Sequence, residues 1–325
     1  MKRRLWIAPA LAAALLTLAG CGSGPTASTG TGDPANPDNV TIGLVPIVDV
    51  APVYLGISKG FYADQGINLT PELASGGAAL LPAVVSGSYQ FGFSEVASLI
   101  VASSKGLPID MVAPASSSTG DAADDYAGVL VPASSSAQSM KDLEGKKVAI
   151  NSIQGINYVL ARDAVDSAGG DSSKVNFVEM AFPDMLTALS SGQIDAAFEP
   201  QPFFDIGQSQ GARNLYSLYA ESTPNLEVTA YFTTTEYAQQ NPDLVSRFVT
   251  ATQQSLTYAA EHPDEARDAL STYTKIDPGL IATMTLPDWP SDFNEDSLGF
   301  VAGLTDKYGL TANKVDVSQM INTAK

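Results

Sequence analysis

Two series of short apolar strands, each alternating with helices, constrain the fold of this chain more than any other feature. The first series begins at Val40 and the second at Lys147. Strands joined by helices of this length form βαβ units, which pack into mostly parallel sheets. The alternation therefore predicts an α/β fold with two mostly parallel sheets and flanking helices.

The expected elements follow from apolar periodicity and from the Gly and Pro residues that interrupt it. In the first series we expect strands at 40–45, 68–73, 89–93 and 109–114, and helices at 52–62, 77–85 and 96–104. In the second we expect strands at 147–151, 175–180 and 196–199, a helical turn at 140–143, and helices at 156–168 and 183–190. Helices should follow from Pro242 to His262, over 264–273, around Trp289 and over 296–307.

The two series carry equivalent turns and are joined by two extended crossings. Ser86-Gly87 and Ser191-Gly192 each close a helix shortly before an apolar strand. The crossings are expected near 129–131 and 228–232. This arrangement predicts lobe one from residues 39–129 plus 232–325, lobe two from residues 130–231, and a ligand cleft between them, because ligands bind at the carboxyl ends of strands.

The N-terminus predicts export and a lipid anchor. Basic residues at 2–4 precede a short apolar run, which ends in Leu18-Ala19-Gly20-Cys21. Residues 1–20 are expected to be a lipoprotein signal peptide and Cys21 the acylated residue. The alternatives are a plain signal peptide with a chance cysteine, or an N-terminal anchor. Residues 21–38 then form a flexible tether, because their composition buries no apolar surface.

Charge and composition exclude several functions. Removing residues 1–20 takes three basic residues from 17 and no acidic residue from 35, which leaves 14 against 35, or −21. This charge disfavours nucleic acid as a partner and favours a soluble monomer. The chain has one Cys and one His, so we expect no disulfide, no metal site and no cofactor.

Three stretches carry a family resemblance. They are YLGISKGFYADQGINLTPELASGGAALLPAVVSGSYQFGFSEVASL at 54–99, DLEGKKVAINSIQGINYVLARDAVDSAGGD at 142–171 and MLTALSSGQIDAAFEPQPF at 185–203. Together they resemble the substrate-binding proteins of ABC importers for nitrate, alkanesulfonates, taurine and thiamine-pyrimidine precursors, and 286–310 also fits that branch. The resemblance implies a two-lobed, type II periplasmic-binding-protein-like fold with a hinge. It also implies a small-molecule solute, an ABC permease and its cytoplasmic ATPase as partners.

Candidate ligand-binding residues come from the loops that follow strands, since such loops line the cleft in this fold. In lobe one they are Asp49, Tyr54, Ser75, Gly76, Gly77, Ser94, Glu95 and Ser116. In lobe two they are Ser152, Gln154, Gly155, Asn157, Pro183, Glu199 and Phe203. Asp49 can also cap the helix that follows it, and the serines can act as caps alone.

The charges in these loops favour a solute that donates hydrogen bonds. The loops contain no Lys or Arg but include Asp49, Glu95 and Glu199, which would repel an anion. Aromatic side chains in the same loops can stack on a flat ring. We therefore expect a neutral or cationic nitrogenous solute, such as an aminopyrimidine. Because the free N–H groups of helix termini favour anions, a sulfonate, taurine or nitrate is the alternative.

Two further classes of function remain open. One is an enzyme, because a fungal class that makes the thiamine pyrimidine has this fold and consumes its own histidine. The lone His262 is expected at a helix end far from the cleft, and without a cleft histidine no Ser–His–Asp triad can form. Glu95 and Glu199 could form a carboxylate pair as in glycosidases, with no other feature in support. The other class is a sensory or adhesive lipoprotein, which only a neighbouring permease or a transport phenotype would separate from a transport protein.

Overall fold

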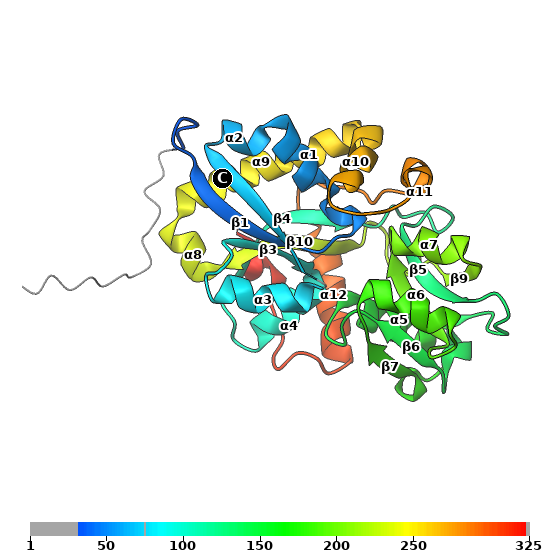
Figure 1. The fold of residues 1–325 in the computed structure, drawn as a ribbon. Coiled ribbons are helices and arrows are strands. Elements are labelled where there is room, and N and C mark those ends of the chain that lie inside the picture. The colour runs from blue at the N-terminus through cyan, green and yellow to red at the C-terminus, as the bar shows by residue number, and fades with distance from the viewer. Residues whose placement is uncertain (1–31, 75, 323–325) are drawn as a thin grey trace, which may run out of the picture.

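The computed structural model describes residues 32–74 and 76–322 and arranges them in two lobes, each built on a five-stranded sheet (Figure 1). The strands of the first sheet are β2 (Ile67–Leu73), β1 (Asp38–Leu44), β3 (Phe91–Glu95), β10 (Glu227–Thr234) and β4 (Ile109–Ser117), in spatial order. Those of the second are β7 (Asn176–Glu179), β6 (Lys147–Ile150), β8 (Ala196–Pro200), β5 (Ala127–Pro132) and β9 (Ala212–Tyr216).

The two sheets repeat one topology. In the first, β1 is parallel to β2 and β3, whereas β10 is antiparallel to both β3 and β4. In the second, β6 is parallel to β7 and β8, and β5 is antiparallel to both β8 and β9. Each sheet therefore has four strands running one way and one running against them, which confirms the mostly parallel expectation.

The odd strand of each sheet belongs to a crossing of the chain. β5 lies wholly in the second sheet, although the chain reaches it from β4 in the first. β10 lies wholly in the first sheet and follows β9 in the second. The lobe boundaries expected at 129/130 and 231/232 fall inside these two strands. The chain therefore enters the next sheet a few residues before each expected boundary, at the start of β5 and of β10.

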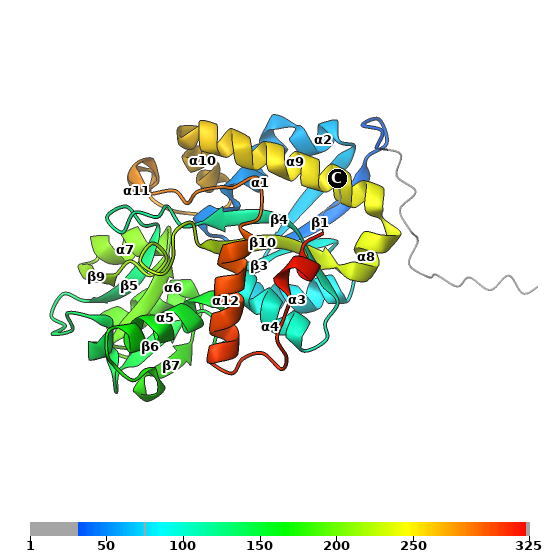
Figure 2. The ribbon, with the colours of Figure 1, turned by 180° about the vertical axis from the view of Figure 1, so that it is seen from behind.

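Helices cover both faces of the sheets (Figures 1 and 2). Those of the first lobe before the crossing are η1 (Val48–Val50), α1 (Ala51–Lys59), α2 (Phe61–Asp64), α3 (Gly77–Val85) and α4 (Val96–Ser104). Lobe two carries η2 (Met140–Leu143), α5 (Ile156–Ser167), η3 (Ser172–Lys174), α6 (Phe182–Ser190) and α7 (Phe203–Ser209). The C-terminal part adds α8 (Thr235–Gln240), α9 (Pro242–Glu261), α10 (Pro263–Ala269), η4 (Leu270–Thr272), α11 (Pro278–Thr283), α12 (Glu295–Lys307) and η5 (Val317–Met320).

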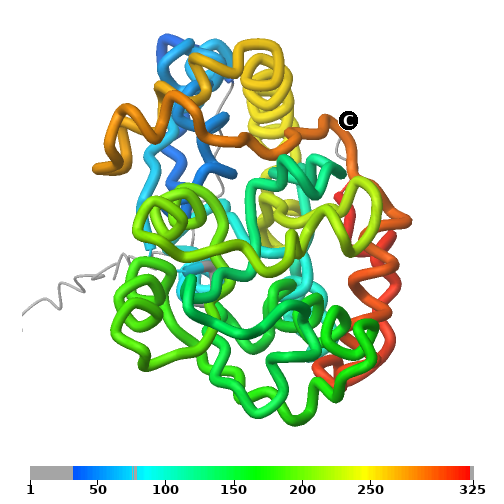
Figure 3. The backbone as a smooth tube through the Cα atoms, turned by 90° about the vertical axis from the view of Figure 1, so that its right-hand side faces the viewer, coloured from blue at the N-terminus to red at the C-terminus, as the bar shows by residue number. Residues whose placement is uncertain are grey.

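The helix α9 anchors the core of lobe one. Its predicted apolar stripe is buried, and Phe248 stacks on Phe91 of β3 with ring centroids 3.7 Å apart. The later helix α12 packs against both α4 of lobe one and α5 of lobe two. Figure 3, in which lobe two faces the viewer, shows α12 along the side of that lobe. The C-terminal part therefore belongs to lobe one but also braces lobe two.

Three local expectations were wrong, and some elements were not expected at all. The helix expected at 52–62 breaks at Gly60, whose φ of 83° is left-handed and ends α1. Asp49 does not cap that helix, because the cap position is Val50 without a side-chain bond. No helix surrounds Trp289 in the described chain; the neighbouring Asp288 forms a β-bridge instead. The elements α7, β9 and α8 were not predicted.

The described residues contain no helix that could cross a bilayer. Residues 1–31, with the predicted signal peptide, Cys21 and most of the tether, lie outside the described part. Asp38, the last residue of the expected tether, is the first residue of β1 and pairs with Arg247 of α9 at 2.7 Å.

Candidate functional site

A small closed cavity lies between the lobes at the carboxyl ends of their strands. Its lining from the first sheet and its loops is Val45, Ile47, Asp49, Phe93, Ser94, Glu95 and Thr229. Its lining from the second sheet and its loops is Asn151, Asn157, Phe182, Pro200 and Tyr219. The volume left between these side chains is about 20 Å³, room for about one water molecule. The structure is therefore closed around its own side chains.

Glu95 bridges the two lobes across this cavity. It ends β3 in lobe one, and its Oε2 accepts a hydrogen bond from the backbone N–H of Ile156 at 2.8 Å. Its Oε1 accepts from the side-chain amides of Asn151 and Asn157, the latter at 3.1 Å. Burial raises the pKa of Glu95 to about 7, although these hydrogen bonds oppose the shift. All three donors belong to lobe two.

Asp49 is the second acidic residue of the lining and is only 1% exposed. Its Oδ1 accepts a hydrogen bond from Ser116, whose hydroxyl also lies 2.6 Å from that of Thr229. Its Oδ2 is buried and has no hydrogen-bond partner among the described residues. Burial raises the pKa of Asp49 to about 6. At neutral pH this residue therefore offers an unsatisfied, mostly ionised acceptor to the cavity.

The lobe-two side of the cavity combines amides with aromatic rings. Tyr219 donates to Oδ1 of Asn157 at 2.8 Å, and burial, followed by Glu95 and Asp49, raises the pKa of its hydroxyl well above the usual value. Phe182 lies on the same side of the cavity. Among the described lining residues none is basic. This wall can stack on a flat ring, but it offers no cation to an anion.

Glu199 is buried and unpaired, next to the cavity rather than in its lining. It stands in β8 opposite Gly128 of β5, one residue before Pro200, which does line the cavity. Neither carboxylate oxygen has a hydrogen-bond partner in the described chain. Burial raises the pKa of Glu199 well above its usual value. The group is therefore stable only when protonated or when it meets a donor.

The structure brings together four of the residues expected from the sequence and places the rest nearby or elsewhere. Asp49, Ser94, Glu95 and Asn157 line the cavity. Ser116 lies behind Asp49, Tyr54 stacks on Tyr273 with centroids 4.2 Å apart, and Phe203 stacks on Phe182 at 6.0 Å. Ser152 and Gly155 shape the loop before α5, Gln154 accepts from Lys105 at 2.9 Å, and Pro183 is exposed. Gly76 and Gly77 begin α3, and Ser75 lies outside the described residues.

Several lining residues were missing from the sequence prediction. Asn151 directly follows β6, which ends at Ile150. The strand expected from the sequence extends to residue 151, so Asn151 was counted in the strand and not in the loop after it. Phe182, by contrast, was among the aromatic side chains expected to stack on a solute ring; it precedes the chosen Pro183 and begins α6. Tyr219 lies in a segment without regular structure between β9 and β10, and no periodic signal marks it.

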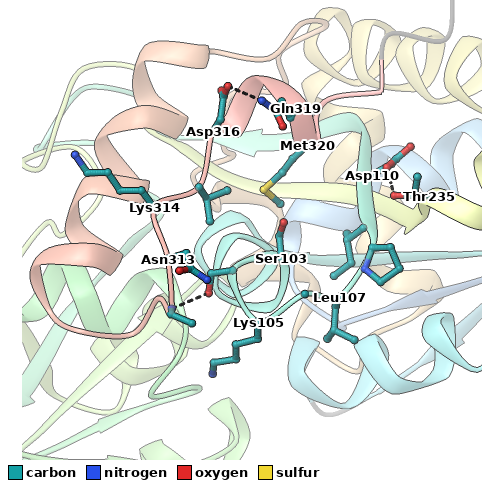
Figure 4. A pocket seen from close by; sticks show the side chains of 16 residues that line it. Ser103, Lys105, Leu107, Asp110, Thr235, Asn313, Lys314, Asp316, Gln319 and Met320 are labelled. Atoms are coloured by element: carbon teal, nitrogen blue, oxygen red, sulfur yellow. Dashed lines mark hydrogen bonds between the residues drawn. The ribbon is translucent and has the colours of Figure 1, made fainter.

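A larger hollow of about 700 Å³ lies outside this cavity, and all of its lining residues belong to lobe one (Figure 4). It is a groove between the end of α4 and the C-terminal segment, with Ser103, Lys105 and Asp110 on one side and Lys314 and Asp316 on the other. None of the predicted ligand-binding residues lines it. Size alone therefore does not mark the functional site of this chain.

The family model described as "NMT1/THI5 like" matches residues 47–266, which include both crossings and most of the cavity lining. The chain belongs to this family. The match covers the segments in which the sequence resemblance was found up to residue 203, and it extends through α9.

Individual relatives of this NMT1/THI5-like chain differ in what they bind. A Bacillus subtilis (strain 168) protein assigned to aliphatic sulfonate binding is 25% identical over 289 residues, 86% of this chain and 81% of the relative. A formylaminopyrimidine-binding protein of Halalkalibacterium halodurans is 23% identical over 223 residues, 68% of this chain and 65% of the relative. The solved alkanesulfonate-binding protein SsuA of Xanthomonas axonopodis pv. citri has a TM-score of 0.74 at 17% identity, covering 88% of this chain and 99% of that one. This last similarity shows that the fold is that of a two-lobed binding protein.

One relative bears the name of an enzyme, the 4-amino-5-hydroxymethyl-2-methylpyrimidine phosphate synthase of Legionella pneumophila. It is 24% identical over 224 residues, 67% of this chain and 68% of the relative. In the present chain His262 ends α9 and stacks on Tyr258 with ring centroids 3.9 Å apart, and it is not part of the cavity lining. The described residues hold no cluster of three metal-ligating side chains.

Proposed function

We propose that this chain is the extracytoplasmic solute-binding component of an ABC importer, and that it captures a neutral or cationic nitrogenous ring between its lobes. Asp49, Ser94, Glu95 and Asn157 would contact the solute directly, and Glu199 would lie in reach after a small movement. An aminopyrimidine has the required chemistry, because its ring stacks and its N–H groups donate.

The observation that carries this proposal is the unpartnered Oδ2 of Asp49. A buried acceptor without a donor costs free energy, and it persists where function requires it. Asp49 lines a cavity whose described lining has two carboxylates and no basic side chain. A solute N–H would satisfy this oxygen, whereas a sulfonate or nitrate would place a further negative charge beside the carboxylate of Asp49.

A sulfonate is the second candidate, because one relative is assigned to aliphatic sulfonate binding and the compared solved structure is that of an alkanesulfonate-binding protein. The amino end of α5 faces the cleft, as an anion site would require. Its first N–H is already held by Glu95 at 2.8 Å. An anion would therefore compete with a carboxylate of the protein itself.

A thermal-shift screen followed by calorimetry separates these candidates. The panel contains aminopyrimidines, simple amines, alkanesulfonates, taurine and nitrate. A solute at 100 times its dissociation constant adds about 2.7 kcal/mol of stability. Stabilisation by an aminopyrimidine or amine supports the proposal, and stabilisation by sulfonates or nitrate alone contradicts it.

The transport cycle we infer needs the lobes to separate before the solute enters, since the closed cavity has room for about one water molecule. Solute then stabilises the closed form by bridging the lobes. The closed monomer would dock on a membrane permease that a cytoplasmic ATPase drives. Deleting a permease encoded beside this chain should abolish uptake of the solute; unchanged uptake would favour the sensory or adhesive class instead.

The membrane attachment we propose rests on Cys21, the only cysteine. Acylation there would tether the folded body through the segment that precedes β1. Cys21→Ser should release the protein from membranes into the soluble fraction. Mass spectrometry of the N-terminal peptide should find the lipid in the unaltered protein, and an unmodified thiol would contradict the anchor.

We further propose that the chain binds its solute without converting it. Incubation with the solute identified in the screen, followed by chromatography, should return that solute unchanged. The appearance of a product, and its loss in Glu95→Gln, would place this chain with its synthase relative instead.

A further inference from the structure

The side chain of Glu95 does not serve its own helix. Glu95 occupies the position that precedes α4, but it makes no cap hydrogen bond there. Its carboxylate instead crosses to lobe two and accepts three hydrogen bonds, from Asn151, Ile156 and Asn157. One carboxylate therefore satisfies a helix terminus and two side-chain amides of the opposite lobe.

The loop before α5 is shaped to receive this carboxylate. Gly155 has a φ of −93°, which any residue adopts, so its backbone does not require glycine. A Cβ at this position would stand 2.0 Å from Oε2 of Glu95, far inside contact distance. Space for the carboxylate of lobe one is therefore the reason for glycine at residue 155.

The second carboxylate of the cavity lining, Asp49, points to the same arrangement. Asp49 offers an acceptor, its buried and unpartnered Oδ2, whereas the donors of lobe two are taken by Glu95. An anion that displaced Glu95 would leave two carboxylates unpaired in a cavity without a basic side chain among its described lining.

We propose that Glu95 is a latch, which closes the protein without solute and selects against anionic solutes by occupying their position at the amino end of α5. This inference rests on the proposed solute-binding function and deepens it. A donor solute can enter between Glu95 and Asp49 and pair with both. An anion must compete with the latch and then close the lobes without it.

The latch is tested by the distance between the lobes in the absence of solute. The full chain carries Cys21→Ser, and spin labels are placed through Ala63→Cys on α2 and Gln193→Cys after α6, both exposed positions. The unaltered latch should give a single short distance, and Glu95→Ala should raise the ratio of open to closed protein at least tenfold. A closed distance that persists in Glu95→Ala, or an open distance in the unaltered protein, overturns the proposal.

Glu179→Gln is the matched control. Glu179 also accepts a backbone N–H of this loop, from Ile153 at 3.0 Å, but it belongs to lobe two itself. Its substitution should leave the distance unchanged. Should Glu95→Ala fold poorly, Glu95→Gln keeps the side-chain shape while removing the charge, and it should open the protein by a smaller factor.

The selectivity arm uses sulfate as the anionic probe. Sulfate should stabilise Glu95→Ala in a thermal-shift assay and leave the unaltered protein unchanged, whereas equal shifts in both proteins overturn the selection against anions. This result is independent of the solute screen. If no nitrogenous solute binds, the proposed function is contradicted. The interlobe distances still test, separately, whether Glu95 holds the lobes closed.

Discussion

The two lobes repeat one sheet topology but present opposite hydrogen-bonding groups to the cavity between them. Lobe one supplies the acceptors Asp49 and Glu95, and lobe two supplies the donors Asn151, Ile156 N–H and Asn157. Since the strand orders match, this difference lies in the residues at the strand ends. The shared fold thus places the cavity, and the residues at the strand ends set which hydrogen-bonding groups line it.

A change of pH tests this difference between the lobes most broadly. Low pH protonates the carboxylate acceptors of lobe one and leaves the amide donors of lobe two unchanged. Burial raises the pKa of the cavity acids Asp49 and Glu95 to about 6 and about 7. It also raises the pKa of two acids outside the cavity lining, Asp125 before β5 and Glu227 at the start of β10, to about 6 and about 8. Such groups contribute their full stability below their ordinary pKa, and that contribution is lost as pH rises through the raised values. Each contributes about 1.4 kcal/mol for every pH unit between its ordinary and its raised pKa, so the free energy of unfolding should fall by several kcal/mol between pH 5 and 8. Urea titrations across this range check it, and a flat profile would contradict it.

Glu199 is the exception in the comparison, an unpaired acid in the donor lobe. Glu199→Gln should have little effect at pH 5 and should stabilise the protein increasingly as pH rises above the ordinary pKa of Glu, because the buried carboxyl must keep a proton that the amide does not need. Urea midpoints at pH 5 and 8 measure this. Glu261→Gln, at the exposed end of α9, is the control. If the urea midpoints of both variants change equally between pH 5 and 8, burial of the Glu199 carboxyl does not destabilise the protein.

Gly155→Ala disturbs the contact between the two lobes from lobe two, which supplies the donors. The added Cβ would lie 2.0 Å from Oε2 of Glu95, and such overpacking costs about 1–3 kcal/mol. We expect a lower thermal midpoint together with an open interlobe distance. Gly303→Ala in α12 meets no atom within 4 Å and should gain about 0.4–1 kcal/mol. A closed distance in Gly155→Ala would argue against the tight fit.

Asp49→Asn sharpens the role of the unpartnered acceptor. The amide keeps the side-chain shape and can still accept from Ser116, but it removes the charge that would hold a solute N–H. Hydrogen bonds to charged groups contribute about 1.5–3 kcal/mol, so affinity for the solute from the screen should fall about 10- to 100-fold by calorimetry. Asp64→Asn on α2 is exposed and serves as the control. Unchanged affinity would remove Asp49 from the site.

Lys307→Met probes a contact between the lobes that lies outside the cavity. Lys307 of α12 pairs with Asp163 of α5 at 2.6 Å, with half of the lysine side chain exposed. Exposed pairs contribute about 0–1 kcal/mol, so stability should change by less than about 1 kcal/mol and the closed distance should persist. An open protein would show that α12, rather than Glu95, holds the lobes together.

The sequence predicted most of the elements because their apolar periodicity is strong. The helices at 77–85 and 96–104 match α3 and α4 to the residue. The short α7 and β9 were missed, since only a few residues carry each pattern. In the site, strand-end reasoning found Asp49, Glu95 and Asn157, but their partners depend on lobe contacts that no local pattern encodes.

The fate of Glu95 shows where such reasoning stops. A carboxylate after a strand predicts an acceptor for a solute, and it equally predicts a helix cap. The structure gives it a third role, as partner of the opposite lobe. Only the distance between lobes distinguishes these roles, and that distance is a property of tertiary packing.

The crossing strands also set an order in which the two halves can form as the chain emerges. The sheet of lobe two draws all its strands from one continuous stretch, β5 to β9. The sheet of lobe one lacks the partner of β4 until β10, residues 227–234, arrives to join β3 and β4. Long-range pairing of this kind is slow. Lobe two can therefore complete its sheet while that of lobe one is still unfinished, and an unfinished sheet of this kind exposes strand edges that are prone to aggregation.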